Sequence, residues 1–146
     1  MKVGVLATMA FAILIGFPIA SSAGLAPDVD TDGIPDVLDK CTLDSRNATA
    51  PSTCDTDADG YGNVCDADFD QDKVVTASDF SMFFIPRFKS GSDGTPAPAV
   101  GADMDCDGAM TSGDFSMFFI PKFKGLLGGA VPGPSGLSCA GTPGCS

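Results

Sequence analysis

Hydrophobic residues in this chain gather in three places, an N-terminal run and two later segments of ten residues. The N-terminal run covers residues 3–20 and is almost wholly apolar. The later segments, 80–89 and 115–124, have the sequences FSMFFIPRFK and FSMFFIPKFK and differ only at Arg87 and Lys122. The rest of the chain is polar and rich in turn-forming residues. The pattern therefore predicts a leader and two short apolar elements in an otherwise irregular chain.

Each of the two later segments fits a short helix better than a strand. In the first, the phenylalanines fall on one helical face, at Phe80, Phe83, Phe84 and Phe88. We expect Asp79 to be the N-cap and Pro86 to bend or end the helix near residues 82–85. Because neither helix can bury its apolar face alone, the two should pack on each other. An aromatic patch for a partner protein is the alternative.

Residues 1–23 have the features of a signal peptide. Lys2 gives a positive start, and Ser21, Ser22 and Ala23 supply the small residues for cleavage before Gly24. We therefore expect a secreted, extracellular protein. The alternative is a retained N-terminal membrane anchor, because the apolar run is close to the ~18 residues that a membrane span requires.

The charge of the chain comes from one acidic residue type. The formal net charge is −11, and all 19 acidic residues are Asp, without Glu or His. Since Glu suits exposed helices better than Asp, Asp alone indicates carboxylates placed in turns, as loops that bind hard cations require. Zinc is disfavoured, because the chain has no His and no C-x-x-C motif. Nucleic acid is excluded as a partner, because its phosphates need a basic surface.

The aspartates fit four copies of a twelve-residue calcium loop, with ligands at positions 1, 3, 5, 7, 9 and 12 and Gly at position 6. Loop 1 (28–39) offers Asp28, Asp30, Asp32, Asp36 and Asp39. Loop 2 (55–66) offers Asp55, Asp57, Asp59, Asn63 and Asp66. Loop 3 (68–79) offers Asp68, Asp70, Asp72, the carbonyl of Val74, Thr76 and Asp79. Loop 4 (103–114) offers Asp103, Asp105, Asp107, the carbonyl of Ala109, Thr111 and Asp114, so we expect about four Ca²⁺ ions per chain.

Position 6 of the loops must make a sharp turn. Gly33, Gly60 and Gly108 fill it in loops 1, 2 and 4, whereas Lys73 fills it in loop 3. A merely acidic, solubilising segment would not place Gly there in three loops of four. We expect Lys73 to adopt a positive φ at some energetic cost, which should weaken loop 3.

Two family resemblances follow from these loops. Residues 68–124 resemble a type I dockerin, on the two loop-helix repeats with Asp at position 12 and no incoming helix. Residues 28–66 look like thrombospondin type 3 repeats, on the segments DVDTDGIPDVLDKC and DTDADGYGNVCD. The first resemblance implies a small all-α, EF-hand-like pair, and the second implies an irregular wire wrapped around calcium ions.

The expected fold is thus mostly irregular and calcium-stabilised. Wire-like calcium repeats at 24–67 precede the dockerin-like pair at 68–124, which contains a flexible linker at 90–101. The tail at 125–146 is rich in Gly and Pro and should be irregular. An N-glycosylation sequon, a weak motif, stands at 47–49.

Six cysteines follow the leader, and an even number in a small exported chain indicates disulfides. The thrombospondin resemblance implies a Cys41–Cys65 bridge. Cys139 and Cys145 are then natural partners within the tail, which leaves Cys54 and Cys106, although six cysteines allow other pairings.

Catalysis has few groups to use, because the chain lacks His and Glu and shows no nucleophile paired with a base. We expect no enzyme but a secreted calcium-binding structural or adhesion module, whose partner would be a cell-surface or matrix protein. The alternative is a dockerin that binds a cohesin in a polysaccharide-degrading complex. In that family loop positions 10 and 11 contact the cohesin, and here they do not hold the usual Ser and Thr pair but Ala77 and Ser78, then Ser112 and Gly113.

Overall fold

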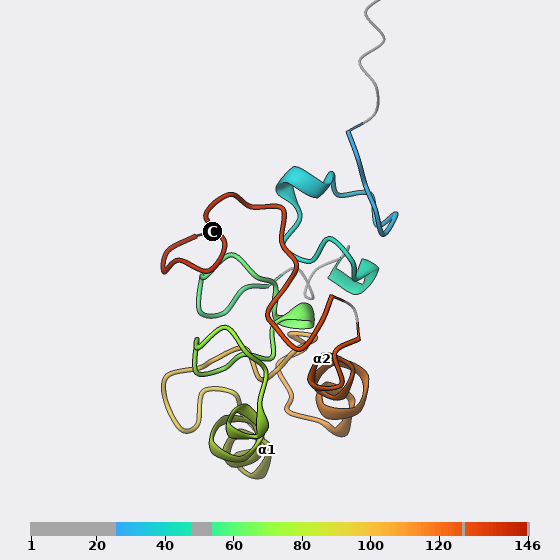
Figure 1. Cartoon of the computed structure of the whole chain (residues 1–146). Helices are drawn as coiled ribbons and strands as arrows, with labels where there is room; N and C mark the ends of the chain where they lie inside the picture. The colour runs from blue at the N-terminus through green and yellow to red at the C-terminus, as the bar shows by residue number, and fades with distance from the viewer. Residues whose placement is uncertain (1–25, 48–53, 127, 146) are drawn as a thin grey trace, which may run out of the picture.

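The computed structural model describes residues 26–47, 54–126 and 128–145 (Figure 1). Within those ranges it contains two helical segments and no strand. Single 3₁₀ turns occur at Asp36–Leu38 (η1), Ser45–Asn47 (η2) and Asn63–Cys65 (η3). The expected irregular fold with two short helices is therefore confirmed. The predicted leader lies outside the described residues, and none of the described helices is long and apolar enough to cross a membrane.

Both helical segments start with two α-helical residues, 77–78 and 112–113, continue as π-helix and end as α-helix. The first joins η4 (Asp79–Phe84) to α1 (Ile85–Ser90), and the second joins η5 (Asp114–Phe119) to α2 (Ile120–Phe123). The amide of Ile85 donates to the carbonyl of Phe80, five residues back, directly before Pro86. Since a proline ring collides with the carbonyl four residues earlier in an α-helix, the wider π turn accommodates it. The helix therefore continues through Pro86, so of the two predicted outcomes, a bend or an end near residues 82–85, the end is wrong.

The N-cap of the first helical segment lies three residues before the predicted one. The first helical segment begins at Ala77, so Thr76 occupies the N-cap. The Thr76 hydroxyl accepts from the amide of Ser78 at 3.0 Å, and the Asp79 carboxylate accepts from the amide of Thr76 at 2.7 Å. This reciprocal pair is a capping box, in which Asp79 is the third helical residue and not the cap. The second repeat forms the same box between Thr111 and Asp114.

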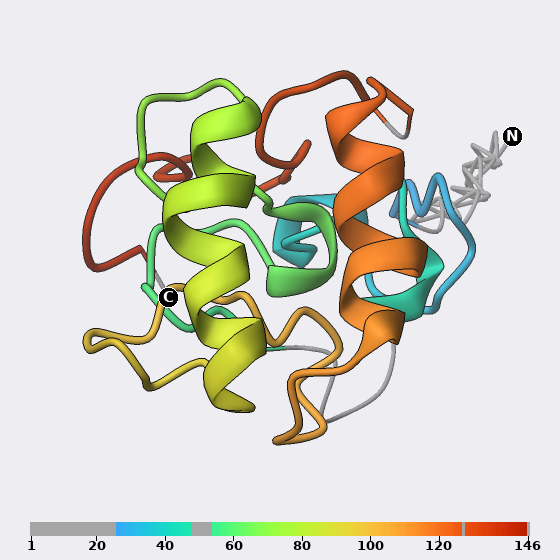
Figure 2. The same cartoon turned by 90° about the horizontal axis from the view of Figure 1, so that it is seen from below.

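The two helical segments lie side by side and antiparallel (Figure 2). Their contact is built from Phe rings: centroids lie 5.2 Å apart for Phe80 and Phe115, and 5.5 Å apart for Phe84 and Phe119. Phe69, from loop 3, stacks on Phe84 and on Phe119. The expected core between the repeats is thus confirmed.

The first half of the chain packs onto this helical pair. Its buried residues Val64, Cys65 and Ala67 belong to the same apolar cluster as Phe84 and Phe119. The guanidinium of Arg46 lies 4.2 Å from the ring centroid of Phe118. The first half therefore shares a core with the second, although the thrombospondin resemblance implied only an irregular wire.

Arg87 and Lys122, where the two repeats differ, are both buried and hold the segment that follows each helix. Arg87 is 3% exposed and donates to the carbonyls of Asp93, Pro96 and Pro98. Lys122 is 1% exposed and donates to the carbonyl of Gly133. A guanidinium offers several donors in a fork, whereas an ammonium is a compact point charge. The linker at 90–101, expected to be flexible, is thus fixed by several hydrogen bonds.

The tail lacks helix and strand in its described part, as predicted, but it is not loose. It runs back across the first half of the chain, where Figure 1 shows the red segment beside the cyan and green loops. The amide of Gly133 donates to the carbonyl of Cys65, and the amide of Gly136 donates to the carbonyl of Asp39. The tail therefore ties the end of the helical pair to loops 1 and 2.

Candidate metal-binding loops

Each predicted loop brings three carboxylates together. In each cluster, one oxygen atom from every member lies within 4.8 Å of the others. The clusters are Asp28, Asp30 and Asp32 in loop 1; Asp55, Asp57 and Asp59 in loop 2; Asp68, Asp70 and Asp72 in loop 3; and Asp103, Asp105 and Asp114 in loop 4. Each cluster could hold a metal ion.

The four loops share a backbone conformation that is left-handed at positions 4 and 6, and residue type explains only position 6. Position 6 has a positive φ in all of them, 92° at Gly33 and at Gly60, 90° at Gly108, and 74° at Lys73. The positive φ predicted for Lys73 is thus confirmed. Position 4 is also left-handed in all four loops, although it holds a different residue in each, with φ between 57° and 63° at Thr31, Ala58, Gln71 and Cys106. Since a non-Gly residue rarely adopts positive φ, this recurrence shows that the loop dictates the conformation. Sequence reasoning missed position 4, because its residue types give no signal.

Hydrogen bonds from the backbone turn the carboxylates inward. The position 1 carboxylate of Asp68 accepts from the amides of Asp72 and Lys73, at 3.1 and 2.6 Å. Loops 1 and 2 repeat this pair of bonds, and in loop 4 the amide of Gly108 donates to Asp103. The position 5 carboxylates each accept from the amide of position 7, at 2.6 to 2.9 Å. These bonds fix the orientation of the carboxylates at positions 1 and 5.

Closure of the loop differs between the two halves of the chain. In loops 3 and 4 the position 12 carboxylates close it, because Asp79 accepts from the amide of Phe69 and Asp114 accepts from that of Met104, both at 2.8 Å. Thr76 and Thr111 donate their hydroxyls to these same carboxylates. In loops 1 and 2 position 9 closes the loop instead: the amide of position 2 donates to Asp36 at 2.8 Å and to Asn63 at 2.9 Å.

The remaining predicted ligands lie outside the four clusters. Asp39 is 1% exposed and accepts from the amide of Cys41 and from the side-chain amide of Asn47. Asp66 is 6% exposed and accepts from the amide of Asp68. Asp79 and Asp107 accept hydrogen bonds from backbone amides of their own loops. The amides of Val74 and Ala109 donate to the carboxylate at position 5. Asp36 and Asn63 close their loops, as described above.

Three carboxylate oxygens inside the clusters are buried and have no hydrogen-bond partner. They are Oδ2 of Asp30, Oδ2 of Asp32 and Oδ1 of Asp103. A buried polar atom without a partner is costly, and buried polar atoms are partnered in the great majority of cases. A cation in loop 1 and another in loop 4 would supply the missing partner for each of the three atoms.

Burial, with a smaller contribution from neighbouring charges, raises the pKa of several loop carboxylates. Burial, and then the nearby charges of Asp59 and Asp55, raises the pKa of Asp57 to about 7. Burial raises the pKa of Asp68 to about 6 and that of Asp66 well above its ordinary value. Burial also raises the pKa of Asp30, Asp59, Asp79, Asp103 and Asp105. Burial therefore disfavours the ionised form of these carboxylates, and a bound cation would offset that cost.

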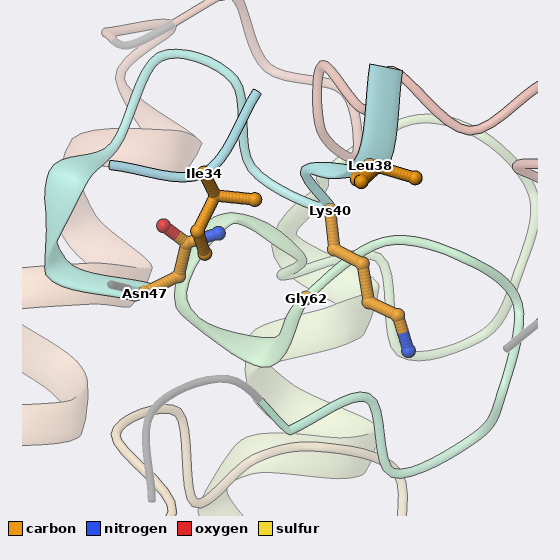
Figure 3. Close-up of a pocket in the computed structure, with 5 residues that line it drawn as sticks. All are labelled: Ile34, Leu38, Lys40, Asn47 and Gly62. Atoms are coloured by element: carbon orange, nitrogen blue, oxygen red, sulfur yellow. The ribbon is translucent and has the colours of Figure 1, made fainter. Parts of the chain in front are cut away.

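A cavity of about 220 Å³ lies between loops 1 and 2, lined by Ile34, Leu38, Lys40, Asn47 and Gly62 (Figure 3). The ammonium of Lys40 lies 3.0 Å from the Asp55 carboxylate. Asn47 is 2% exposed and donates to Asp39, so the sequon's acceptor nitrogen is used inside the fold. The rest of the sequon lies outside the described residues. The lining offers no nucleophile next to a base.

All six cysteines lie in the described part of the chain and form three disulfides. Cα atoms are 5.8 Å apart for Cys41 and Cys65, 5.5 Å for Cys139 and Cys145, and 6.4 Å for Cys54 and Cys106. The Cys41–Cys65 pairing that the thrombospondin resemblance implied is confirmed, as are the two that followed from it. The Cys54–Cys106 bridge joins the start of loop 2 to position 4 of loop 4.

Comparison with family models, with characterised proteins and with solved structures finds no match to this chain. The functional argument therefore rests on the chain's own residues. They provide four clusters of hard oxygen ligands on one repeated backbone, held by disulfides and by a shared apolar core. Such an arrangement can bind cations and display a surface.

Proposed function

We propose that this chain is a secreted calcium-binding module with a structural or adhesive role, whose four loops hold about four Ca²⁺ ions. The observation that carries the proposal is the set of buried carboxylate oxygens without partners, on Asp30, Asp32 and Asp103, inside loops of one shared backbone. The three disulfides fit an extracellular location, because they persist where the environment is oxidising.

The donor atoms favour calcium over other metals. Every cluster consists of carboxylates alone, and Ca²⁺ takes six to eight oxygen ligands in flexible geometry. Zn²⁺ prefers Cys and His, and the six cysteines are engaged in disulfides. Mg²⁺ demands a near-ideal octahedron and keeps several waters, which a loop built from many carboxylates does not suit.

Calorimetric titration of the oxidised chain with calcium tests this function. We expect about four ions per chain, with dissociation constants on the order of 10⁻⁴ to 10⁻³ M, as in other extracellular modules. Four matched variants replace the position 3 carboxylate, Asp30→Asn, Asp57→Asn, Asp70→Asn and Asp105→Asn, and each should remove or weaken one ion. Asp44→Asn, outside the loops, is the control that keeps the stoichiometry. Two ions or fewer in the unaltered chain would show that at least two loops do not bind, and the four variants would identify them.

A second candidate function is docking onto a cohesin-like protein. The helical pair carries two apolar cavities of about 190 and 160 Å³. The two linings consist of corresponding residues of the two repeats, which are 35 positions apart. Phe88 borders one cavity and Phe123 the other, and their side chains are 40% and 41% exposed. A pull-down with an immobilised cohesin, with calcium and with EDTA, tests it. Binding in calcium alone would support docking, and no binding in either condition would leave the structural role.

A further inference from the structure

Near the C-terminal end of the chain, a small ring closed by a disulfide contacts loop 2. Cys139 and Cys145 close this ring, residues 139–145, through their disulfide. The amide of Gly141 donates to the carbonyl of Asp59 at 2.7 Å. The amides of Gly144 and Cys145 donate to the carbonyl of Ala58 at 2.7 and 2.9 Å. The ring therefore binds backbone atoms that lie at positions 4 and 5 of loop 2.

The carbonyls that the ring contacts depend on the closed shape of loop 2. Ala58 has a φ of 57°, the left-handed conformation that position 4 shares among all four loops. Its neighbours Asp57 and Asp59 belong to the carboxylate cluster. Without a cation those carboxylates repel one another, and the strained left-handed residue loses its support. Opening of the loop would turn the carbonyls of positions 4 and 5 away from the ring.

The contact between ring and loop is close enough to require glycine. A Cβ atom on Gly60 would overlap Sγ of Cys145, whereas a Cβ on Gly33, the equivalent residue of loop 1, meets no atom within 4 Å. Both glycines have a φ of 92°, so a side chain strains the backbone equally at either site. Loop 2 is therefore shaped to receive the ring, and loop 1 offers a matched comparison.

We propose that the ring at 139–145 is a calcium-dependent clasp. It docks on loop 2 when that loop holds its cation and detaches when the cation leaves. Because coupling between two binding events is reciprocal, the docked ring also raises the cation affinity of loop 2. This inference rests on the proposed calcium binding and adds a conformational response to it, localised to one loop and to the C-terminal end of the chain.

Tyr61 provides an intrinsic probe of the docked state. It is the only Tyr in a chain without Trp. It occupies position 7 of loop 2 and faces the tail, because a Cβ on Gly133 would lie 2.7 Å from its ring and one on Gly141 would lie 3.4 Å from its hydroxyl. Its emission therefore reports on both loop 2 and the tail that covers it.

Amide hydrogen exchange of the full oxidised chain tests the clasp. In excess calcium, the amides of Gly141, Gly144 and Cys145 should be protected, and in EDTA their exchange should accelerate by at least about ten-fold. Gly60→Ala should release these amides even in calcium and weaken the loop 2 ion several-fold, with a matching change in Tyr61 emission. Gly33→Ala, which carries the same backbone strain, should leave the three amides protected.

A second pair of variants guards against misfolding of the Gly60 variant. Asp57→Asn empties loop 2 and should release the ring, whereas Asp105→Asn empties loop 4 and should not. Equal protection of the three amides in Asp57→Asn and Asp105→Asn, or in calcium and EDTA, would overturn the clasp. If calorimetry shows calcium binding while these amides do not respond, the clasp alone fails. If no calcium binds at all, the proposed function fails as well.

Discussion

All four loops share one backbone conformation, but loops 1 and 2 lead into a different structure from loops 3 and 4. Loops 3 and 4 each run into a helical segment that a capping box starts and whose Phe rings pack against the other helix. Loops 1 and 2 each run into a single 3₁₀ turn, η1 or η3. The difference shows that the first aspartates and the position 6 turn specify the conformation of the loop, while the residues at positions 9 and 12 specify how the loop is closed.

The two halves also differ in what holds them in place. Phe84 and Phe119 of the helical pair are each 1% exposed, whereas Val37 and Leu38 of η1 are 63% and 67% exposed. Loop 2 contributes Val64 and Cys65 to the shared core, and loops 1 and 2 are otherwise held by the Cys41–Cys65 bridge and by hydrogen bonds to the tail. Their order should therefore depend more on cations than that of the helical pair.

Removal of calcium is the largest perturbation that the comparison predicts. In EDTA the oxidised chain should become largely disordered, because carboxylates within 4.8 Å of one another repel without a cation. Loops 1 and 2 should lose all amide protection, and the helical pair should retain the most. Circular dichroism, hydrodynamic radius and hydrogen exchange, measured in EDTA and then in excess calcium, check this prediction.

Magnesium is the control for that experiment, because it fits flexible all-oxygen loops poorly and should not restore the compact form. An unchanged spectrum and radius in EDTA would mean that the core and the disulfides suffice for folding. Equal loss of protection in the two halves would remove the distinction between them.

Truncation of core Phe rings is the next largest effect. Phe84→Ala and Phe119→Ala should each lower the free energy of unfolding by roughly 3 to 5 kcal/mol, because both rings are fully buried between the repeats. Phe83→Ala should cost less, since its ring is only partly buried. Leu38→Ala, in the exposed turn of loop 1, should stay within about 0.5 kcal/mol. Urea unfolding in excess calcium measures all four, and a Leu38→Ala cost equal to that of Phe84→Ala would contradict the division of roles.

The pH dependence of the metal-free chain is a smaller effect and falls mainly on loops 2 and 3. Burial raises the pKa of Asp57 to about 7 and that of Asp68 to about 6, above the ordinary value of 3.8. The folded state therefore holds more protons than the unfolded state between pH 4 and 7, and stability falls as the pH rises through that window. In EDTA, helical ellipticity should be greater at pH 5 than at pH 7.5.

Calcium should reverse this trend, because a cation needs the ionised carboxylates and competes with their protons. In excess calcium the same measurement should show greater stability at pH 7.5 than at pH 5. Identical ellipticity at both pH values in EDTA would indicate that these carboxylates are not buried in the metal-free chain.

Sequence reasoning predicted the loops, the helical pair and the left-handed Lys73, because each depends on local spacing. It placed the N-cap one turn too late, at Asp79, and did not foresee the π-helical turn that carries the helix through Pro86, because a capping box and a π-helical turn involve hydrogen bonds that periodicity does not encode. It also missed the tail's contacts with loops 1 and 2 and the role of Arg87. Those contacts join residues that are not neighbours in the sequence and use backbone carbonyls, so the residue types give no indication of them.

The smallest predicted effect compares loops 3 and 4, which differ at position 6. Lys73 has a φ of 74° and an exposed side chain, while Gly108 has a φ of 90° with no atom near its missing Cβ. Lys73→Gly should raise the free energy of unfolding by about 0.5–1 kcal/mol. The substitution relieves left-handed strain, and the extra freedom of Gly in the unfolded chain offsets part of that gain. Gly108→Lys should lower the free energy of unfolding by a similar amount. Lys73→Ala removes the positive charge but keeps the Cβ, so it separates electrostatic from conformational effects. Calorimetry should show tighter calcium binding in loop 3 for Lys73→Gly than for Lys73→Ala, and equal affinities would mean that charge, and not backbone strain, sets the difference between the two loops.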